Sequence, residues 1–189
     1  MRVMKVRRPR GISISRSLRI LMLPAICSAL LSGQAAPPVE ARPQTPAHSA
    51  SMVGKPAPLF MRRTLDGRLI NLSRLRGKVV LLNFWATWCA PCQSEMPTFN
   101  TWLRQYGGLG FEVVGISMDD DADAARSLVS KLRLDYPVAM GDAAFGRRYG
   151  GVLGLPTTFL IDRRGRVVQE FQGGGKLNSL EHAVKAALK

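Results

Sequence analysis

Cysteine and histidine are scarce in this chain, whose 189 residues include three cysteines and two histidines. So few thiols exclude the disulfide framework that stabilises many small secreted domains. Cys27 lies in an apolar N-terminal stretch, which leaves Cys89 and Cys92 as the cysteines of the remaining chain. A zinc site at this pair would need two further Cys or His ligands at similar spacing, and Cys27, His48 and His182 are not well placed to supply them.

Acidic residues are absent from residues 1–35, which contain seven Lys and Arg residues. This basic start, the apolar run 20–31 and the small residues that follow it have the layout of a secretory signal, with cleavage before Ala36. The run is shorter than the roughly 20 residues that span a bilayer, and Pro24 interrupts it. We therefore predict an exported protein with a signal peptide at 1–35, and an uncleaved membrane anchor is the alternative.

Half of the net charge belongs to this N-terminal segment. The whole chain carries +14, and without residues 1–35 it has 20 basic and 13 acidic residues, a net charge of +7. A strongly basic chain suggests a nucleic-acid partner. Because so much of the charge lies in the export segment, we expect no nucleic-acid partner here.

The rest of the chain divides into a linker and one domain. Residues 36–53 are rich in Pro and Ala and contain almost nothing apolar to bury, which predicts a spacer. Residues 54–189 are long enough for one well-buried domain. Apolar patterning in that domain predicts strands at 78–86, 111–118, 136–139, 157–161 and 167–171, and helices at 91–106, 124–132, 143–149 and 177–188.

This order of elements indicates an α/β fold with a central mixed β-sheet and helices on both faces. Asp66-Gly67, between two short runs within 59–72, predicts an additional N-terminal hairpin. The acidic run 119–123 precedes a predicted helix, and no calcium-loop spacing follows it. We interpret these acids as helix capping residues.

The sequence Trp88-Cys89-Ala90-Pro91-Cys92 stands where a predicted buried strand gives way to a helix. A cysteine at a helix N-terminus lies beside unpaired backbone N–H groups and the positive end of the helix dipole, which favour the thiolate. Cys92 follows one helical turn later, within reach of a mixed disulfide on Cys89. The spacing therefore predicts Cys89 as nucleophile and Cys92 as resolving thiol. A purely structural disulfide is disfavoured, because so short a loop restricts the unfolded chain little.

Several motifs together are similar to the exported TlpA/ResA-like thiol-disulfide oxidoreductases of the thioredoxin superfamily. They are Gly54-Lys55-Pro56-Ala57-Pro58, the run from Val79 to Cys89, Glu95-Met96-Pro97, and the run from Gly154 to Asp162. The resemblance spans residues 54–189 and implies a thioredoxin fold. It also implies reduction of disulfides in periplasmic or extracytoplasmic protein substrates, often during cytochrome c or copper-oxidase maturation, with electrons from a membrane donor protein.

The resemblance assigns further residues to the site. It implies a cis peptide bond before Pro156, and a backbone edge at Leu155 and Pro156 that docks an extended substrate. It also makes Glu95 the acid near the site, which can take a proton from Cys92 if burial raises its pKa. Where ordinary thioredoxins have a buried Asp, this chain has Asn83, which cannot exchange a proton at neutral pH.

The remaining expectations concern the surface and the alternatives. Trp88 is expected to be a contact surface, and Pro91 to start the helix beside the substrate. No cofactor or metal is expected apart from the redox-active Cys89–Cys92 disulfide. A peroxiredoxin would need a Thr three residues before its reactive Cys, where this chain has Ala86. A copper metallochaperone using the thiol pair usually adds a His ligand, and His182, in the last predicted helix, is not well placed for that role.

Overall fold

The computed structural model describes residues 50–189. The predicted signal peptide and residues 36–49 of the predicted linker lie outside the described residues. The centre of the fold is a five-stranded sheet in the order β5-β4-β3-β6-β7. Its strands are β3 (Val79–Trp85), β4 (Phe111–Ser117), β5 (Val138–Met140), β6 (Thr157–Ile161) and β7 (Val167–Gln172).

The sheet is mixed, as predicted. β3 pairs in parallel with β4, and β4 with β5, whereas β6 runs antiparallel to both β3 and β7. All seven residues of β3 are buried. A strand covered on both faces has no polar face, which explains why its sequence shows no alternation.

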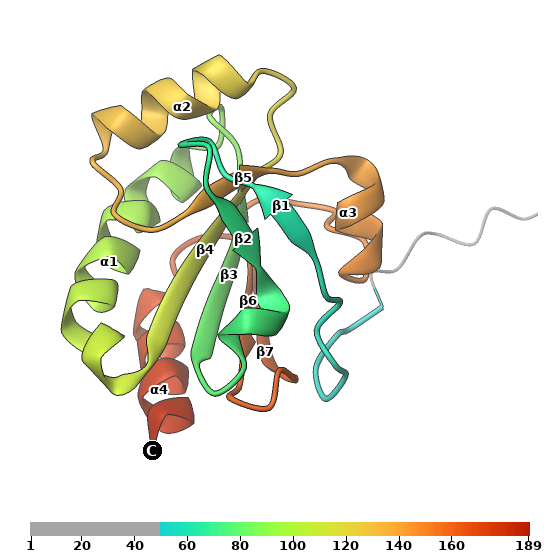
Figure 1. The fold of residues 1–189 in the computed structure, drawn as a ribbon, viewed down its shortest axis with the longest axis vertical. Coiled ribbons are helices and arrows are strands. Elements are labelled where there is room, and N and C mark those ends of the chain that lie inside the picture. Colours follow the sequence, from blue (N-terminus) through green and yellow to red (C-terminus); the bar gives the residue numbers. More distant parts are fainter. Residues whose placement is uncertain (1–49) are drawn as a thin grey trace, which may run out of the picture. The chain divides into compact units, whose positions relative to one another are not determined.

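Helices cover both faces of the sheet (Figure 1). One apolar core lies under α1 (Ala90–Tyr106), α2 (Ala122–Lys131) and α4 (Leu177–Leu188), and includes Met96, Phe99 and Leu180 among its members. The second core lies on the opposite face. There Phe145 of α3 (Ala143–Arg148) packs against aromatic side chains of the sheet and of the N-terminal segment.

The N-terminal hairpin is present and antiparallel, with strands β1 (Met61–Arg63) and β2 (Leu69–Asn71). Gly67 has a φ of 85°, a left-handed conformation that glycine adopts without strain. The short 3-10 helices η1 (Leu72–Leu75) and η2 (Gly107–Leu109) follow β2 and α1. The predicted thioredoxin fold with an N-terminal hairpin extension is therefore confirmed.

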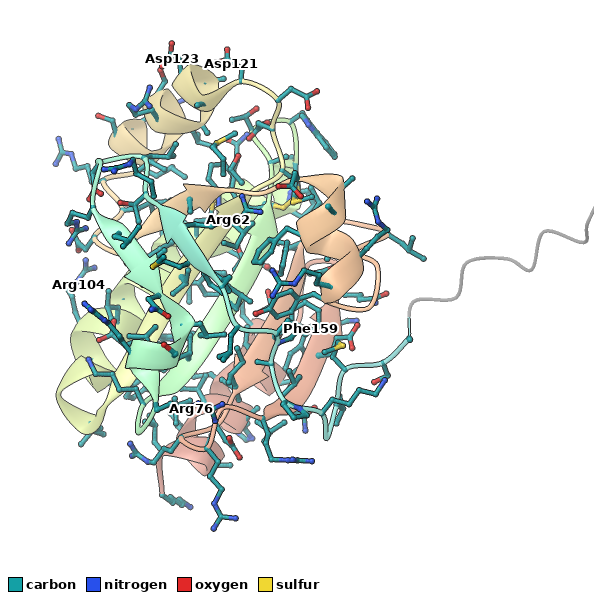
Figure 2. The ribbon with its side chains drawn as sticks, turned by 45° about the vertical axis from the view of Figure 1, so that its right-hand side comes forward. Arg62, Arg76, Arg104, Asp121, Asp123 and Phe159 are labelled. Carbon is teal, nitrogen blue, oxygen red and sulfur yellow. A yellow bond between two sulfur atoms is a disulfide. The ribbon has the colours of Figure 1, made fainter. Side chains whose placement is uncertain are left out.

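Within the acidic run before α2, Asp121 acts as the helix cap. The side chain of Asp121 accepts a hydrogen bond from the Asp123 backbone N–H at 2.8 Å, at the first turn of α2. Figure 2 shows the Asp121 and Asp123 side chains at this helix end, pointing away from the fold. The helix starts at Ala122, two residues before the predicted start.

The folded domain begins earlier than the predicted boundary at residue 54. The Ala50 N–H donates to the Gly150 carbonyl at 3.0 Å, and the Met52 N–H donates to Glu170 at 3.1 Å. The Met52 side chain is buried in the second core. Residues 50–53 are therefore part of the domain, because the Met52 side chain and two backbone hydrogen bonds anchor this segment.

Substitution of Met52 tests this boundary. Met52→Ala should lower the free energy of unfolding by about 2 kcal/mol or more, because it removes buried apolar volume. Val53→Ala is the matched control, and since Val53 is exposed, its effect should stay within about 0.5 kcal/mol. Urea unfolding curves measure both values. Equal midpoints for the two variants would contradict the assignment of Met52 to the core.

Candidate active site

A tight turn joins β3 to α1 and brings the first cysteine to the helix end. The Cys89 N–H donates to the Ala86 carbonyl at 3.1 Å, which closes a β-turn with Thr87 and Trp88 at its centre. Cys89 is the N-cap residue of α1, and its Sγ accepts a hydrogen bond from the Cys92 N–H at 3.3 Å. Pro91 lies in the first helical turn, where its missing N–H leaves no bond unmade.

Cys89 and Cys92 form a disulfide, with their Cα atoms 5.3 Å apart. The exposed fraction is 5% for Cys89 and 1% for Cys92. Both cysteines are therefore buried in the apolar core under α1, and Cys89, at the helix cap, is slightly more exposed than Cys92. The N-terminal end of the helix dipole stabilises negative charge at Cys89 when the disulfide is reduced.

Glu95 lies one helical turn after Cys92 and is only 7% exposed. Burial raises the pKa of its carboxyl group, because the charged form loses hydration. The backbone N–H of Gly175 donates to Glu95 Oε1 at 2.9 Å and acts in the opposite direction on that pKa. Glu95 lies within α1 itself, and its raised pKa means that it keeps its proton to a higher pH than an exposed Glu does.

The loop between β7 and α4 covers this part of the site and was missed in the sequence analysis. A Cβ atom at Gly174 would lie 2.8 Å from Pro91 Cβ and 3.5 Å from Glu95 Oε1. Only glycine therefore allows this loop to approach the first turn of α1 so closely. The run of three consecutive glycines at 173–175 was the available sequence signal.

The peptide bond between Leu155 and Pro156 is cis. The expected unpaired backbone edge is only partly present, because the Pro156 carbonyl accepts a hydrogen bond from the Gly173 N–H at 2.8 Å. Within residues 50–189, the backbone N–H and C=O of Leu155 make no hydrogen bond. Of the two residues expected to form the docking edge, Leu155 therefore keeps free backbone groups for a partner.

An apolar groove with a volume of about 390 Å³ opens between Trp88 and Leu155. Trp88 is 73% exposed, as expected for a contact surface. The groove is also lined by three apolar side chains that the sequence analysis did not select, Met118, Val152 and Leu153. Met118 directly follows β4, whereas Val152 and Leu153 belong to the loop between α3 and β6, so only the fold brings them together.

Comparison with known proteins identifies the family. The AhpC/TSA family matches residues 53–170. The thiol-disulfide oxidoreductase ResA of Bacillus thuringiensis subsp. konkukian is 39% identical over 133 residues, which cover 70% of this chain and 77% of that protein. ResA of Bacillus subtilis is 34% identical over 120 residues, covering 64% of this chain and 67% of that protein.

The chain belongs to the AhpC/TSA family and is a ResA-like thiol-disulfide oxidoreductase. A solved structure supports this membership. A thiol:disulfide interchange protein of the thioredoxin family from Chlorobium tepidum has a TM-score of 0.66 and 32% identity, covering 75% of this chain and 100% of that one. The predicted resemblance is confirmed, and so is thiol-disulfide oxidoreductase activity at a Cys-x-x-Cys pair.

The buried polar residue beneath the site differs from that of ordinary thioredoxins. In this ResA-like chain Asn83 is buried on β3 beside Thr158 of β6, and its Nδ2 donates to Thr158 Oγ1 at 2.9 Å. Strand alternation places Asn83 on the same face as Leu81 and Trp85, which is the face covered by α1. An amide at this place cannot accept a proton from Cys92, which leaves Glu95 as the nearby acid.

Within the described part of the ResA-like chain, no group of three or more His, Cys, Asp and Glu side chains is arranged to hold a metal ion. A copper site at Cys89 and Cys92 would thus have no third ligand of these types among residues 50–189. A peroxiredoxin would need a Thr three residues before its reactive Cys. In this chain that position is held by Ala86, which is buried directly after β3, and Thr87 is one residue too close to Cys89. The site geometry therefore supports neither the copper metallochaperone nor the peroxiredoxin alternative.

Glu95→Gln should change how stability depends on pH. Because the folded-state pKa of Glu95 is raised above its ordinary value of 4.5, its stabilising contribution is complete below that value and is lost as pH rises through the folded pKa. The wild-type protein should therefore lose stability relative to Glu95→Gln as pH rises above 4.5. Urea unfolding of the oxidised proteins between pH 4 and 8 measures the difference. A constant difference across this range would show that the Glu95 pKa is not raised.

Proposed function

We propose that this ResA-like protein is an exported reductant, which passes two electrons from a Cys89–Cys92 dithiol to disulfides in extracytoplasmic proteins. The observation that carries the proposal is the position of Cys89 at the N-terminus of α1, next to the apolar groove between Trp88 and Leu155. A protein disulfide can enter such an open site, whereas a deep pocket would select a small molecule.

The first step is attack of the Cys89 thiolate on one sulfur of the partner's disulfide. An S–S bond forms between Cys89 and that sulfur, and the partner's other sulfur leaves as a thiolate. The helix N-terminus favours the attacking thiolate. The free backbone groups of Leu155 can pair with an extended segment of the partner and hold its disulfide beside Cys89.

The second step uses Cys92. Its thiolate attacks Cys89 Sγ, the second partner thiolate leaves, and the Cys89–Cys92 disulfide forms. The partner has then gained two electrons and this protein has lost two. Reduction by a dithiol donor protein restores the starting state, and a membrane donor on the same side of the membrane is the partner we infer.

Glu95 is the proposed proton carrier for the second step. Cys92 must lose its proton before it attacks, and it is almost completely buried. Glu95 lies one turn further along α1, and burial raises its pKa toward the range where it can take up that proton. Asn83 cannot serve as an alternative acceptor because its amide does not titrate near neutral pH.

The expected direction of electron flow is reduction of the partner. Strong oxidants stabilise the reduced thiolate, commonly with a polar or cationic residue between the two cysteines. Ala90 and Pro91 supply no such group here. The helix terminus acts alone, so we infer a redox potential near that of thioredoxin.

Export is inferred from the sequence of residues 1–35, and participation in cytochrome c or copper-oxidase maturation from the family resemblance. Within residues 50–189, no helix is long and apolar enough to cross a bilayer. Localisation of the tagged protein in fractionated cells tests export, together with a variant that lacks residues 2–35. Equal distribution of both proteins would contradict an export signal in this segment.

Replacement of each cysteine separates the two proposed steps. Cys89→Ser should abolish reduction of insulin disulfides, because the attacking sulfur is missing. Cys92→Ser should still attack but should accumulate mixed disulfides, because nothing releases the partner. Non-reducing gels and mass spectrometry measure the trapped species. Trapping by Cys89→Ser instead of Cys92→Ser would reverse the assignment of the two cysteines.

The redox potential tests the direction of electron flow. We expect a value nearer to thioredoxin's roughly −270 mV than to the roughly −120 mV of a strong oxidant. Equilibration of the Cys89–Cys92 pair with glutathione buffers, followed by quantification of free thiols, measures it. A value above about −160 mV would mean that the protein is not a reductant, and that groups outside the motif set its potential.

A further inference from the structure

The turn that carries Cys89 is held by residues outside the Cys-x-x-Cys motif. In a β-turn, the N–H of the second residue points outward and has no partner within the turn. Here that residue is Thr87, which lies two positions before Cys89. An unpaired N–H in a partly buried segment is costly, so the group that receives it controls the conformation of the turn.

Asp119 is that group. The Thr87 N–H lies 3.0 Å from both carboxylate oxygens, and Thr87 Oγ1 donates to Asp119 Oδ1 at 2.7 Å. Asp119 is itself buried, just after the end of β4. Ser117 Oγ donates to its other oxygen at 2.8 Å, so the carboxylate is held in one orientation.

The opposite side of the turn is also held. The Thr87 carbonyl accepts a hydrogen bond from Gln93 Nε2, in the second turn of α1, at 2.6 Å. Thr87 is therefore tied both to β4, through Asp119, and to the cysteine helix, through Gln93. Trp88 and Cys89 follow directly from this doubly held residue.

The neighbouring acids have different roles. Asp120, Asp121 and Asp123 are exposed, and Asp121 caps α2. Among residues 119–123, Asp119 is the acid whose side chain hydrogen-bonds to the turn before Cys89. The capping interpretation of the acidic run therefore explains Asp121 but not Asp119.

We propose that Asp119 is a positioning residue for thiol-disulfide exchange, which acts through Thr87 to hold Cys89 and Trp88 toward the partner's disulfide. The inference rests on the proposed function, because it assumes that Cys89 attacks a disulfide. That attack requires the sulfur to approach along the S–S axis. Small displacements of a reacting group can cost an enzyme up to about a hundredfold in rate.

Three variants test the proposal. Asp119→Ala removes the acceptor, Asp119→Asn keeps one side-chain oxygen that can accept the Thr87 bonds, and Thr87→Val removes the hydroxyl while retaining its shape. Asp121→Asn is the matched control, because it removes a carboxylate two residues away that caps α2. Circular dichroism first establishes that each variant is folded at the assay temperature.

The rate constant for insulin reduction should fall about tenfold or more in Asp119→Ala, and Asp119→Asn should restore most of it. Thr87→Val should lose activity, and combining it with Asp119→Ala should cost less than the sum of the two effects, because both changes act on one contact. Asp121→Asn should match the wild type. A folded Asp119→Ala with unchanged rate, or full additivity of the two changes, would overturn the proposal. If Asp119→Ala does not fold, an unchanged rate in Thr87→Val would overturn it.

A second measurement keeps this test separate from the proposed function. Alkylation of reduced Cys89 by iodoacetamide needs no protein partner. Measured at a pH where the thiol is fully ionised, the alkylation rate should rank the variants in the same order as the rate of insulin reduction does. If the wild type failed to reduce protein disulfides but alkylation followed this order, the proposed function would fail and the role of Asp119 would stand. If alkylation were equal in all variants, the positioning role would be wrong.

Discussion

The first backbone N–H groups of α1 have no carbonyl partner within the helix, and Cys89 caps this end. Its Sγ accepts the Cys92 N–H, so the sulfur that reacts is also the atom that satisfies the helix terminus. The same unpaired groups and the helix dipole favour a negative sulfur after reduction. β3 is buried on both faces and ends at Trp85, and the turn that follows it places the start of α1 at this edge of the sheet. The end of the buried strand therefore determines where Cys89, the proposed nucleophile, lies.

Glu95 shows how two opposing effects are combined at one carboxyl group. Burial raises its pKa and the Gly175 N–H lowers it, with burial the larger effect. Both effects depend on the approach of the glycine loop, since a side chain at Gly174 would collide with Pro91. A Cβ atom at Gly174 would push the loop away from α1. The Glu95 carboxyl group would then be exposed to water and would lose its hydrogen bond to Gly175. The glycines thus help to set the environment of the proposed proton carrier.

The parts of the fold that depend on local sequence were predictable. The buried run at β3, the Asp66-Gly67 hairpin and the Cys-x-x-Cys helix start each rely on neighbouring residues. The errors concern contacts between distant segments. Met52 packs into a core formed mainly by residues far along the chain. The Pro156 carbonyl accepts a hydrogen bond from the N–H of Gly173, which follows the β6–β7 hairpin. A pattern of nearby residues contains no information on such pairings, so the linker boundary was misplaced and the docking edge is only half as open as predicted.

The site separates the route of electrons from that of protons. In the proposed cycle electrons leave through Cys89, on the side where Trp88 and Leu155 line the groove. In the proposed cycle the proton of Cys92 moves along α1 to Glu95, under the glycine loop. Ordinary thioredoxins have an ionisable Asp in the strand beneath the helix, but here Asn83 occupies that place and pairs with Thr158. Because Asn83 does not titrate near neutral pH, the strand beneath α1 takes no part in this proposed proton transfer, whereas the β7–α4 loop, through its Gly175 N–H, contacts the proposed acceptor directly.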